Sequence, residues 1–296
     1  MPVKNFADFA QNCRQHVDQY LDVSFPENLD PTQLRSAMRY SLFNGGKRVR
    51  PILAYASALA INPEQNLRLI DPIAAALESL HSYSLVHDDL PAMDDDDLRR
   101  GKPTCHIAYN EATAILAGDG LQTLAFDYLS RTDLPPDIQM ELVKTLVAGS
   151  GVDGMVLGQA IDLSAVNQQL TLEQLENMHR HKTGALIRAS VRMGAIAAGA
   201  NKEQLNKLDN YAAAIGLAFQ VQDDILDVTS DTATLGKQQG ADIAHNKPTY
   251  VSLLGLEAAQ EKAQSLYKDA INSLNGFDDS ADHLRQLAAY IVERVY

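Results

Sequence analysis

Apolar residues return along this chain at intervals of three and four positions, with polar residues between them. Residues 205–215 show the pattern well, with Leu205, Leu208, Tyr211, Ala212 and Ile215 on one helical face. Ala, Leu, Gln and Glu, which favour helices, recur throughout, and runs of β-branched residues are short. The pattern predicts an all-α fold.

Proline and glycine positions predict where these helices end. They lie at residues 26, 31, 45–46, 62–63, 91, 101–103, 135–136, 149–154, 236–240 and 275–276, with Asn201 as a further break. No shift in composition and no flexible Ser/Gly linker divides the chain. We therefore expect residues 1–296 to form a single domain.

The helix expected over residues 71–90 is the most apolar in the chain and has no wide polar stripe. Such a helix is typical of a buried, central position. It ends at Pro91, and acidic residues gather at that end: six of the ten residues 88–97 are Asp. A buried helix that terminates in carboxylates predicts a site at its carboxyl end.

Composition excludes several classes of protein. With 46% hydrophobic and 21% charged residues the chain is not disordered, and no apolar run is long enough to cross a membrane. The first residues lack the apolar core of a signal peptide, so we expect a cytoplasmic protein. A net charge of −13 disfavours nucleic acid as a ligand, and the two cysteines, Cys13 and Cys105, are too few for a disulfide framework.

Two carboxylate motifs are candidates for metal binding. The first contains Asp88, Asp89 and Asp94, and the second, at residues 219–231, contains an Asp223–Asp224 pair with Asp227 one helical turn beyond Asp223. Hard oxygen ligands suit Mg²⁺, which takes few carboxylates together with substrate phosphates. Read alone, each motif could equally be a solvated acidic surface, although the apolar residues before each motif weaken that interpretation.

Basic residues beside glycines and helix breaks are candidates for binding phosphate oxygens. The segment GGKRVRP at residues 45–51 places cations next to two glycines. Further cations are Arg99 and Arg100 after the Asp run, Lys182 before Thr183, and the later Lys237 and Lys247. Each of these is by itself explained as well by a helix cap or by charge balance.

Five segments in this order together resemble the trans-prenyltransferase (polyprenyl synthase) family, most closely the bacterial farnesyl diphosphate synthases. They are GGKRVRP at 45–51, HSYSLVHDDLPAMDDDDLRRGKPTCH at 81–106, HKTGALI at 181–187, GLAFQVQDDILD at 216–227 and LGKQQGAD at 235–242. The resemblance implies an isoprenoid-synthase helical bundle around a central cavity, with the two Asp motifs facing each other at its mouth, and a homodimer.

The same resemblance implies a Mg²⁺-dependent head-to-tail condensation of isopentenyl diphosphate with dimethylallyl and then geranyl diphosphate, giving farnesyl diphosphate. It implies Mg²⁺ ligands, three ions being held once the allylic diphosphate is bound. Those ligands are Asp88, Asp94 and Asp223, with support from Asp89, Asp224 and Asp227.

Residues that would bind the two diphosphates also follow from the resemblance. By this resemblance, the allylic diphosphate would be bound by Arg99, Lys182 and Lys237, with Lys247 as a further contact. Isopentenyl diphosphate would be bound by Gly46, Lys47, Arg50, His81 and Arg100. The Lys182 carbonyl, Thr183 and Gln220 would direct dipoles toward the allylic cation, so that no protein nucleophile is needed.

Product length is expected to depend on the helix below Asp88. Four residues back returns to the same helical face, which favours Ser84 as a lining residue on periodicity alone. By resemblance an aromatic at Tyr83 would stop growth at fifteen carbons. The chain ends Arg-Val-Tyr, where many relatives end in a basic residue, so the resemblance gives little support for a covering role of this end.

Alternatives remain at this point. A geranyl or geranylgeranyl diphosphate synthase of the same family would share every motif. A terpene cyclase would not need the GGKRVRP segment. Consumption of isopentenyl diphosphate would distinguish a prenyl diphosphate synthase from a terpene cyclase. A non-catalytic partner subunit is disfavoured because both Asp motifs are complete, and a Ca²⁺-binding structural protein because the EF-hand spacing is absent. A His87–Asp88 metal-hydrolase dyad has no completing residues.

Overall fold

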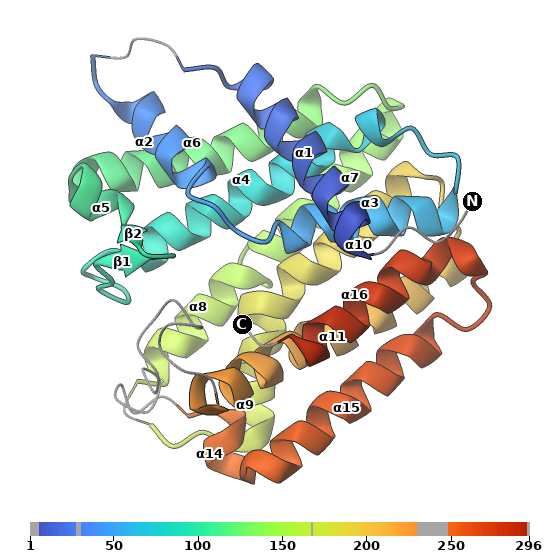
Figure 1. Cartoon of the computed structure of the whole chain (residues 1–296). Coiled ribbons are helices and arrows are strands. Elements are labelled where there is room, and N and C mark those ends of the chain that lie inside the picture. Colours follow the sequence, from blue (N-terminus) through green and yellow to red (C-terminus); the bar gives the residue numbers. More distant parts are fainter. Residues whose placement is uncertain (1–5, 28–30, 167, 230–247, 295–296) are drawn as a thin grey trace. The chain divides into compact units, whose positions relative to one another are not determined.

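The computed structural model of the chain describes residues 6–27, 31–166, 168–229 and 248–294. The described residues are helical apart from turns and one two-stranded hairpin, which confirms the all-α prediction (Figure 1). They form two compact units, which are described separately below. Unit 1 comprises residues 1–55 and 66–143, and unit 2 comprises residues 56–65 and 144–296.

Unit 1 is built around α4 (Asp71–Asp88), whose side chains are buried along most of its length. The other elements of unit 1 are α1 (Phe6–Ser24), α2 (Leu34–Leu42), the first part of α3 (Val49–Ile61), the 3₁₀ turn η1 (Leu67–Leu69), β1 (Leu98–Arg99), β2 (Lys102–Pro103), α5 (Cys105–Ala108), α6 (Glu111–Ser130) and the start of α7 (Pro136–Ser150).

Helix α4 begins with Pro72 in its first turn, where the missing N–H costs nothing, and ends three residues before Pro91. It packs closely along α6, as Figure 1 shows. Gly118 of α6 permits this approach, because a Cβ there would lie 2.1 Å from Nε2 of His87. The apolar run and Pro91 therefore predict α4 correctly, as a central and buried helix.

Unit 2 is built around α11 (Lys202–Thr229), the longest helix among the described residues. Its other elements are the remainder of α3 and α7, α8 (Met155–Ser164), α9 (Leu172–His179), the π-helical turn η2 (Arg180–Gly184), α10 (Ala185–Ala197), α14 (Tyr250–Leu254), α15 (Leu256–Ser273), the 3₁₀ turn η3 (Asp279–Ala281) and α16 (Asp282–Glu293). Helices α10, α15 and α16 and the turn η2 all pack against α11.

No described helix is long and apolar enough to span a bilayer. Cys13 and Cys105 are free thiols, both buried, and burial raises the pKa of each. Such thiols are not reactive nucleophiles at neutral pH, in line with the sequence reading.

Candidate active site

The first Asp motif folds back onto the end of α4. The backbone N–H of Asp94 donates to the Asp88 carbonyl (2.9 Å), and that of Asp96 donates to the Asp89 carbonyl (3.3 Å). Asp95 adopts a left-handed conformation (φ 55°) that makes the turn possible. The six-residue separation between Asp88 and Asp94 is thereby closed, and both residues lie at the carboxyl end of the buried helix.

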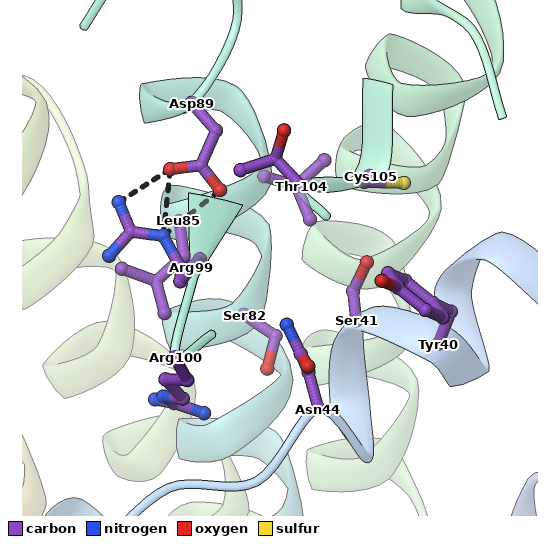
Figure 2. Close-up of a pocket in the computed structure, with 11 residues that line it drawn as sticks. Tyr40, Ser41, Asn44, Ser82, Leu85, Asp89, Arg99, Arg100, Thr104 and Cys105 are labelled. Carbon is purple, nitrogen blue, oxygen red and sulfur yellow. Dashed lines mark hydrogen bonds and ion pairs between the residues drawn. The ribbon is translucent and has the colours of Figure 1, made fainter. Parts of the chain in front are cut away.

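Asp89 is bound by Arg99 of the hairpin (Figure 2). Its two carboxylate oxygens accept from Nε of Arg99 at 2.7 and 2.9 Å, and Nη2 lies 2.5 Å from Oδ1. Asp89 is only 3% exposed, and burial raises the pKa of its carboxyl although Arg99 acts in the opposite direction. Because Arg99 engages both oxygens, this geometry favours Asp89 as a support for the motif over a metal ligand.

The hairpin also brings Arg100 against the glycines of the GGKRVRP segment. Its Nη1 donates to the Gly45 carbonyl, and a Cβ on Gly46 would lie 2.5 Å from that nitrogen. Gly46 therefore gives the Arg100 guanidinium the space that any side chain would take. Two segments 55 residues apart, both predicted to bind isopentenyl diphosphate, meet here.

Positive charge converges on His81 in the middle of α4. Burial lowers the pKa of His81 well below its ordinary value, and Arg50, Arg100, Arg99 and Arg48 each lower it further. The imidazole is therefore neutral at pH 7 and can donate or accept a hydrogen bond.

Arg50 experiences the same cluster of cations. Burial lowers the pKa of Arg50 to about 10, Glu78 opposes the shift, and Arg100 adds to it. The cations from residues 48–50 and 99–100 therefore lie close enough to repel one another. Such repulsion is relieved by an anion, so the arrangement suits a bound diphosphate.

A small cavity lies beside this cluster, between α2, α4 and the hairpin (Figure 2). The side chains of Asn44 and Ser82 face each other in that view. The Asn44 side-chain oxygen is buried and accepts no hydrogen bond from the described residues. The remaining lining residues are Tyr40, Ser41, Leu85, Val86, Asp89, Arg99, Thr104 and Cys105.

Tyr83 and Ser84 lie on α4 one turn before Asp88. The ring of Tyr83 meets the His87 ring in an edge-to-face arrangement, with 5.1 Å between centroids. Burial raises the pKa of the Tyr83 hydroxyl. Ser84 is buried, and its hydroxyl donates to the His81 carbonyl (2.8 Å). Tyr83 and Ser84 thus both lie on the turn of α4 that precedes Asp88.

In unit 2, Lys182 and Thr183 lie in the π-helical turn η2, a local widening of a helix that often marks functional positions. Nζ of Lys182 is 2.5 Å from the carboxylate of Asp162 on α8. Gly158, one turn earlier on α8, allows the two segments to touch, since a Cβ there would lie 2.0 Å from the backbone N of Lys182. Helix α8 therefore sets the position of the turn.

Gln220 and the second Asp motif lie on α11, and the packing of α11 against η2 sets their positions. Gly216 approaches Gly184 at the end of the turn, with 3.1 Å between a Cβ built at Gly216 and the Gly184 Cα. Gln220, Asp223 and Asp227 lie four, seven and eleven residues further along, on the same helical face. Helix α11 thereby aligns one predicted dipole and two predicted metal ligands on the face that meets η2.

The three acidic residues of this motif have different surroundings. Asp223 is partly exposed, whereas Asp224 and Asp227 are buried. The Asp224 carboxylate accepts from the backbone N–H of Tyr250 (2.7 Å) at the start of α14. That contact gives Asp224 a role in holding α14, beside its predicted support of the motif.

Arg294 near the end of the chain reaches Asp223. Its Nη2 lies 2.6 Å from the Asp223 carboxylate and 2.9 Å from the Phe219 carbonyl, and its guanidinium stacks over the Phe219 ring at 4.0 Å. Although the last residue is tyrosine, the carboxyl-terminal segment does supply a cation to the second Asp motif. The final position of the chain, Tyr296, does not predict this contact, because the cation lies two residues earlier.

Two predicted substrate contacts, Lys237 and Lys247, lie outside the described residues. Three residues that the sequence reading missed stand out: Glu78, Asp162 and Arg294, each an ion-pair partner of a motif residue or its neighbour. A role for Glu78 could have been predicted from the sequence, because a single carboxylate in the middle of an otherwise apolar helix requires a buried counter-charge.

Comparison with known proteins shows the family of the chain. Residues 31–291 match the polyprenyl synthetase family model. The chain is 53% identical to the farnesyl diphosphate synthase of Escherichia coli K12, over 97% of this chain and 99% of that protein.

Solved structures give the same result. A putative farnesyl diphosphate synthase from Marinomonas sp. MED121 is 49% identical, with a TM-score of 0.85 over 98% of this chain and 100% of that one. An FPP/GFPP synthase from Zymomonas mobilis is 41% identical, with a TM-score of 0.88 over 97% and 99%. With its motifs in the family's order and its fold shared along nearly the whole length, this chain belongs to the polyprenyl synthetase family.

Proposed function

We propose that this protein is a prenyltransferase that condenses isopentenyl diphosphate with dimethylallyl diphosphate and then with geranyl diphosphate, giving farnesyl diphosphate. The observation that carries the proposal is the meeting of Gly46, Arg50, His81 and Arg100 beside the first Asp motif. This arrangement supports a site for one diphosphate next to candidate ligands for the metal that would hold the other diphosphate. A terpene cyclase binds a single diphosphate and has no use for both.

Isopentenyl diphosphate would bind at the cation cluster of unit 1. Arg50 and Arg100 supply fixed positive charge, Lys47 adds a third cation, and neutral His81 supplies a hydrogen bond. Gly46 leaves room for Arg100 and for the approach of phosphate oxygens to the backbone. Because this diphosphate stays bonded to carbon throughout, its site needs to bind it without activating it.

The allylic diphosphate would bind through Mg²⁺ to Asp88 and Asp94 of unit 1 and to Asp223 and Asp227 of unit 2, with Asp89 in support. Three ions are expected, as in the family. Carboxylate oxygens are suitable ligands, and Arg99 offers the same phosphate a direct contact.

Within the described residues no three acidic, His or Cys side chains are close enough to hold an ion unaided. Phosphate oxygens would therefore complete each coordination sphere, as is usual for Mg²⁺. When bound, the metal supplies positive charge to the departing diphosphate.

The reaction begins as the allylic carbon–oxygen bond breaks and the diphosphate leaves with the electron pair. Lys182 would stabilise that diphosphate, with Lys237 and Lys247 as further contacts. The Lys182 carbonyl, Thr183 and Gln220 would direct negative dipole ends at the allylic cation. The double bond of isopentenyl diphosphate then attacks the cationic carbon, and the released diphosphate takes the proton that is lost. Tyr83 would set the length of the product, with Ser84 lining the same path.

Product analysis tests the proposal. Purified protein is incubated with Mg²⁺, labelled isopentenyl diphosphate and dimethylallyl diphosphate, with an EDTA control. A fifteen-carbon diphosphate formed only with metal is the expected result. A ten- or twenty-carbon product would assign the protein to another synthase of the family, and no condensation at all would favour a non-catalytic partner subunit.

We also propose that the chain works as a homodimer and as one polyprenyl synthase domain over residues 1–296, in the cytoplasm. The family match runs through both units, which supports a single functional domain. In unit 1, Ile115, Leu116 and Met140 expose 44–56% of their surface, and exposed large apolar residues favour association. Light scattering after size-exclusion chromatography would give twice the 32.3 kDa chain mass for a dimer.

A further inference from the structure

Arg48, the middle basic residue of GGKRVRP, is buried and fully engaged by protein atoms. Its side chain is 4% exposed. Nε donates to Asp18 of α1 (2.9 Å), Nη1 donates to Glu78 of α4 (2.7 Å), and Nη2 donates to the Leu42 carbonyl at the end of α2 (2.8 Å). Nη2 also lies 2.8 Å from the Asp18 carboxylate. One guanidinium thus joins three helices of unit 1.

Because its N–H groups are used in this way, Arg48 has little left to offer a phosphate. Its backbone is also left-handed (φ 54°), a conformation that costs free energy for any residue with a side chain. The three contacts hold the backbone there. Arg48 therefore fixes the shape of the segment in which Gly46 and Arg50 lie, and it differs in role from Arg50 although both look alike in the sequence.

Glu78 connects this segment to the part of α4 that contains His81. It is 2% exposed and lies three residues, almost one helical turn, before His81. Its charge also acts on Arg50 and on Arg100, in each case opposing the effect of burial. Glu78 is thus one of the carboxylates, together with Asp18 and Asp89, that balance the cations converging on His81, and its loss would increase the repulsion between these cations.

We propose that Arg48 and Glu78 are positioning residues for the isopentenyl diphosphate site: their buried ion pair holds Gly46 and Arg50 in register with His81 and Arg100. This inference rests on the proposed function of that site. It predicts that breaking the pair harms binding of isopentenyl diphosphate more than binding of the allylic diphosphate, because the hydrogen bonds of Arg48 run to Asp18, Glu78 and Leu42, which belong to neither Asp motif.

The primary test is Glu78→Gln, which keeps the shape and removes the charge. We expect the KM for isopentenyl diphosphate to rise about tenfold or more, because the cations that lose Glu78 move apart and the diphosphate loses one charge-assisted hydrogen bond. Removal of the negative charge by itself would act in the opposite direction and lower the KM, so the direction of the change separates positioning from charge balance. The KM for geranyl diphosphate and kcat should change by less than about threefold. The control is Asp209→Asn in unit 2, which removes the partner of Arg188 and Arg192 far in sequence from the residues of the isopentenyl diphosphate site and should leave both KM values unchanged.

Arg48→Lys is the second variant, since it keeps the charge and one contact to Glu78 and is the milder change if Glu78→Gln does not fold. It should shift the same KM in the same direction by a smaller factor. A folded Glu78→Gln enzyme with both KM values raised equally, or with neither raised, would overturn the inference.

Binding of inorganic pyrophosphate, measured by calorimetry in EDTA, separates this inference from the proposed function. Without metal, the anion should bind at the cation cluster, and Glu78→Gln should weaken this binding about tenfold even if no condensation is detected. If the wild-type protein catalyses no condensation, the proposed function is wrong. If the wild-type protein binds pyrophosphate and Glu78→Gln binds it equally well, the positioning role is wrong.

Discussion

Gly46 shows how a single missing side chain shapes the site. A Cβ at this position would lie 2.5 Å from the Arg100 guanidinium, and the backbone φ of 125° also favours glycine. Gly46→Ala should therefore displace Arg100 and raise the KM for isopentenyl diphosphate about tenfold or more, because one charge-assisted contact is lost. Steady-state kinetics with isopentenyl diphosphate varied gives the measurement.

Gly45→Ala is the matched control for that change. Gly45 has a similar left-handed backbone (φ 95°), but nothing lies within 4 Å of its Cβ position. The substitution should cost about 1–2 kcal/mol of stability through backbone strain while leaving the KM within about threefold. Equal effects of the two variants on the KM would show that strain, and not contact with Arg100, determines binding.

Tyr83 carries the prediction on product length. Its ring packs against the ring of His87, one helical turn before Asp88. Tyr83→Ala should lengthen the product toward twenty carbons because the ring no longer blocks the path. Tyr83→Phe keeps the ring and should keep the fifteen-carbon product. Chromatography of the dephosphorylated products decides, and an active Tyr83→Ala enzyme that still stops at fifteen carbons would exclude this residue as the stop.

At the scale of residues, sequence reading could name the charged motif members but not their partners. Gly46, His81 and Arg100 were predicted together, and the structure does bring them together. The pairs Arg48–Glu78 and Lys182–Asp162 were not predicted, because each joins residues 20 or more positions apart. Such pairs leave no local periodicity, and only packing decides which charge meets which.

The packing of α4 against α6 depends on Gly118. An alanine there would place Cβ 2.1 Å from Nε2 of His87, which is held by the Ile115 carbonyl of α6. Gly118→Ala should lower the free energy of unfolding by about 2 kcal/mol or more, since overpacking outweighs the gain in helix propensity. Gly120→Ala, on the same helix, meets only the flexible end of Met38 and should be close to neutral. Urea unfolding followed by circular dichroism compares the two, and equal midpoints would contradict the packing argument.

At the scale of elements, the sequence predicted what depends on local pattern. Helix α4 is bounded by Asp71 and Asp88, within the expected range 71–90, because an apolar run and a proline mark it. The π-helical turn η2 was not predicted, since no local pattern marks it and the segment it packs against, at Gly158, lies more than 20 residues earlier. The short hairpin was read only as a break at residues 101–103, although its turn is what delivers Arg99 and Arg100.

At the scale of the whole molecule, burial of histidines makes stability depend on pH. Burial lowers the pKa of His81, of His179 (to about 4) and of His283. In the unfolded chain each imidazole takes up a proton near its ordinary pKa of about 6.5, whereas in the folded protein it stays neutral. The unfolded state thus binds more protons below about pH 6.5, so stability should fall as the pH drops from 7 to 5.

His179→Phe isolates one part of this effect. The phenyl ring can keep the edge-on contact with Tyr250 (5.5 Å between centroids) but cannot titrate. For a pKa of about 4 the loss attributable to His179 between pH 7 and pH 5 is about 2 kcal/mol, so the variant should lose about that much less than the wild type. The raised pKa of Asp89 acts in the opposite direction nearer pH 4, but it is common to both proteins and cancels in the comparison. Urea midpoints at pH 7, 6 and 5 give the slopes. Identical slopes would mean that His179 takes up a proton in the folded protein over this pH range, as it does in the unfolded chain. That result would contradict a buried, neutral His179 against α14.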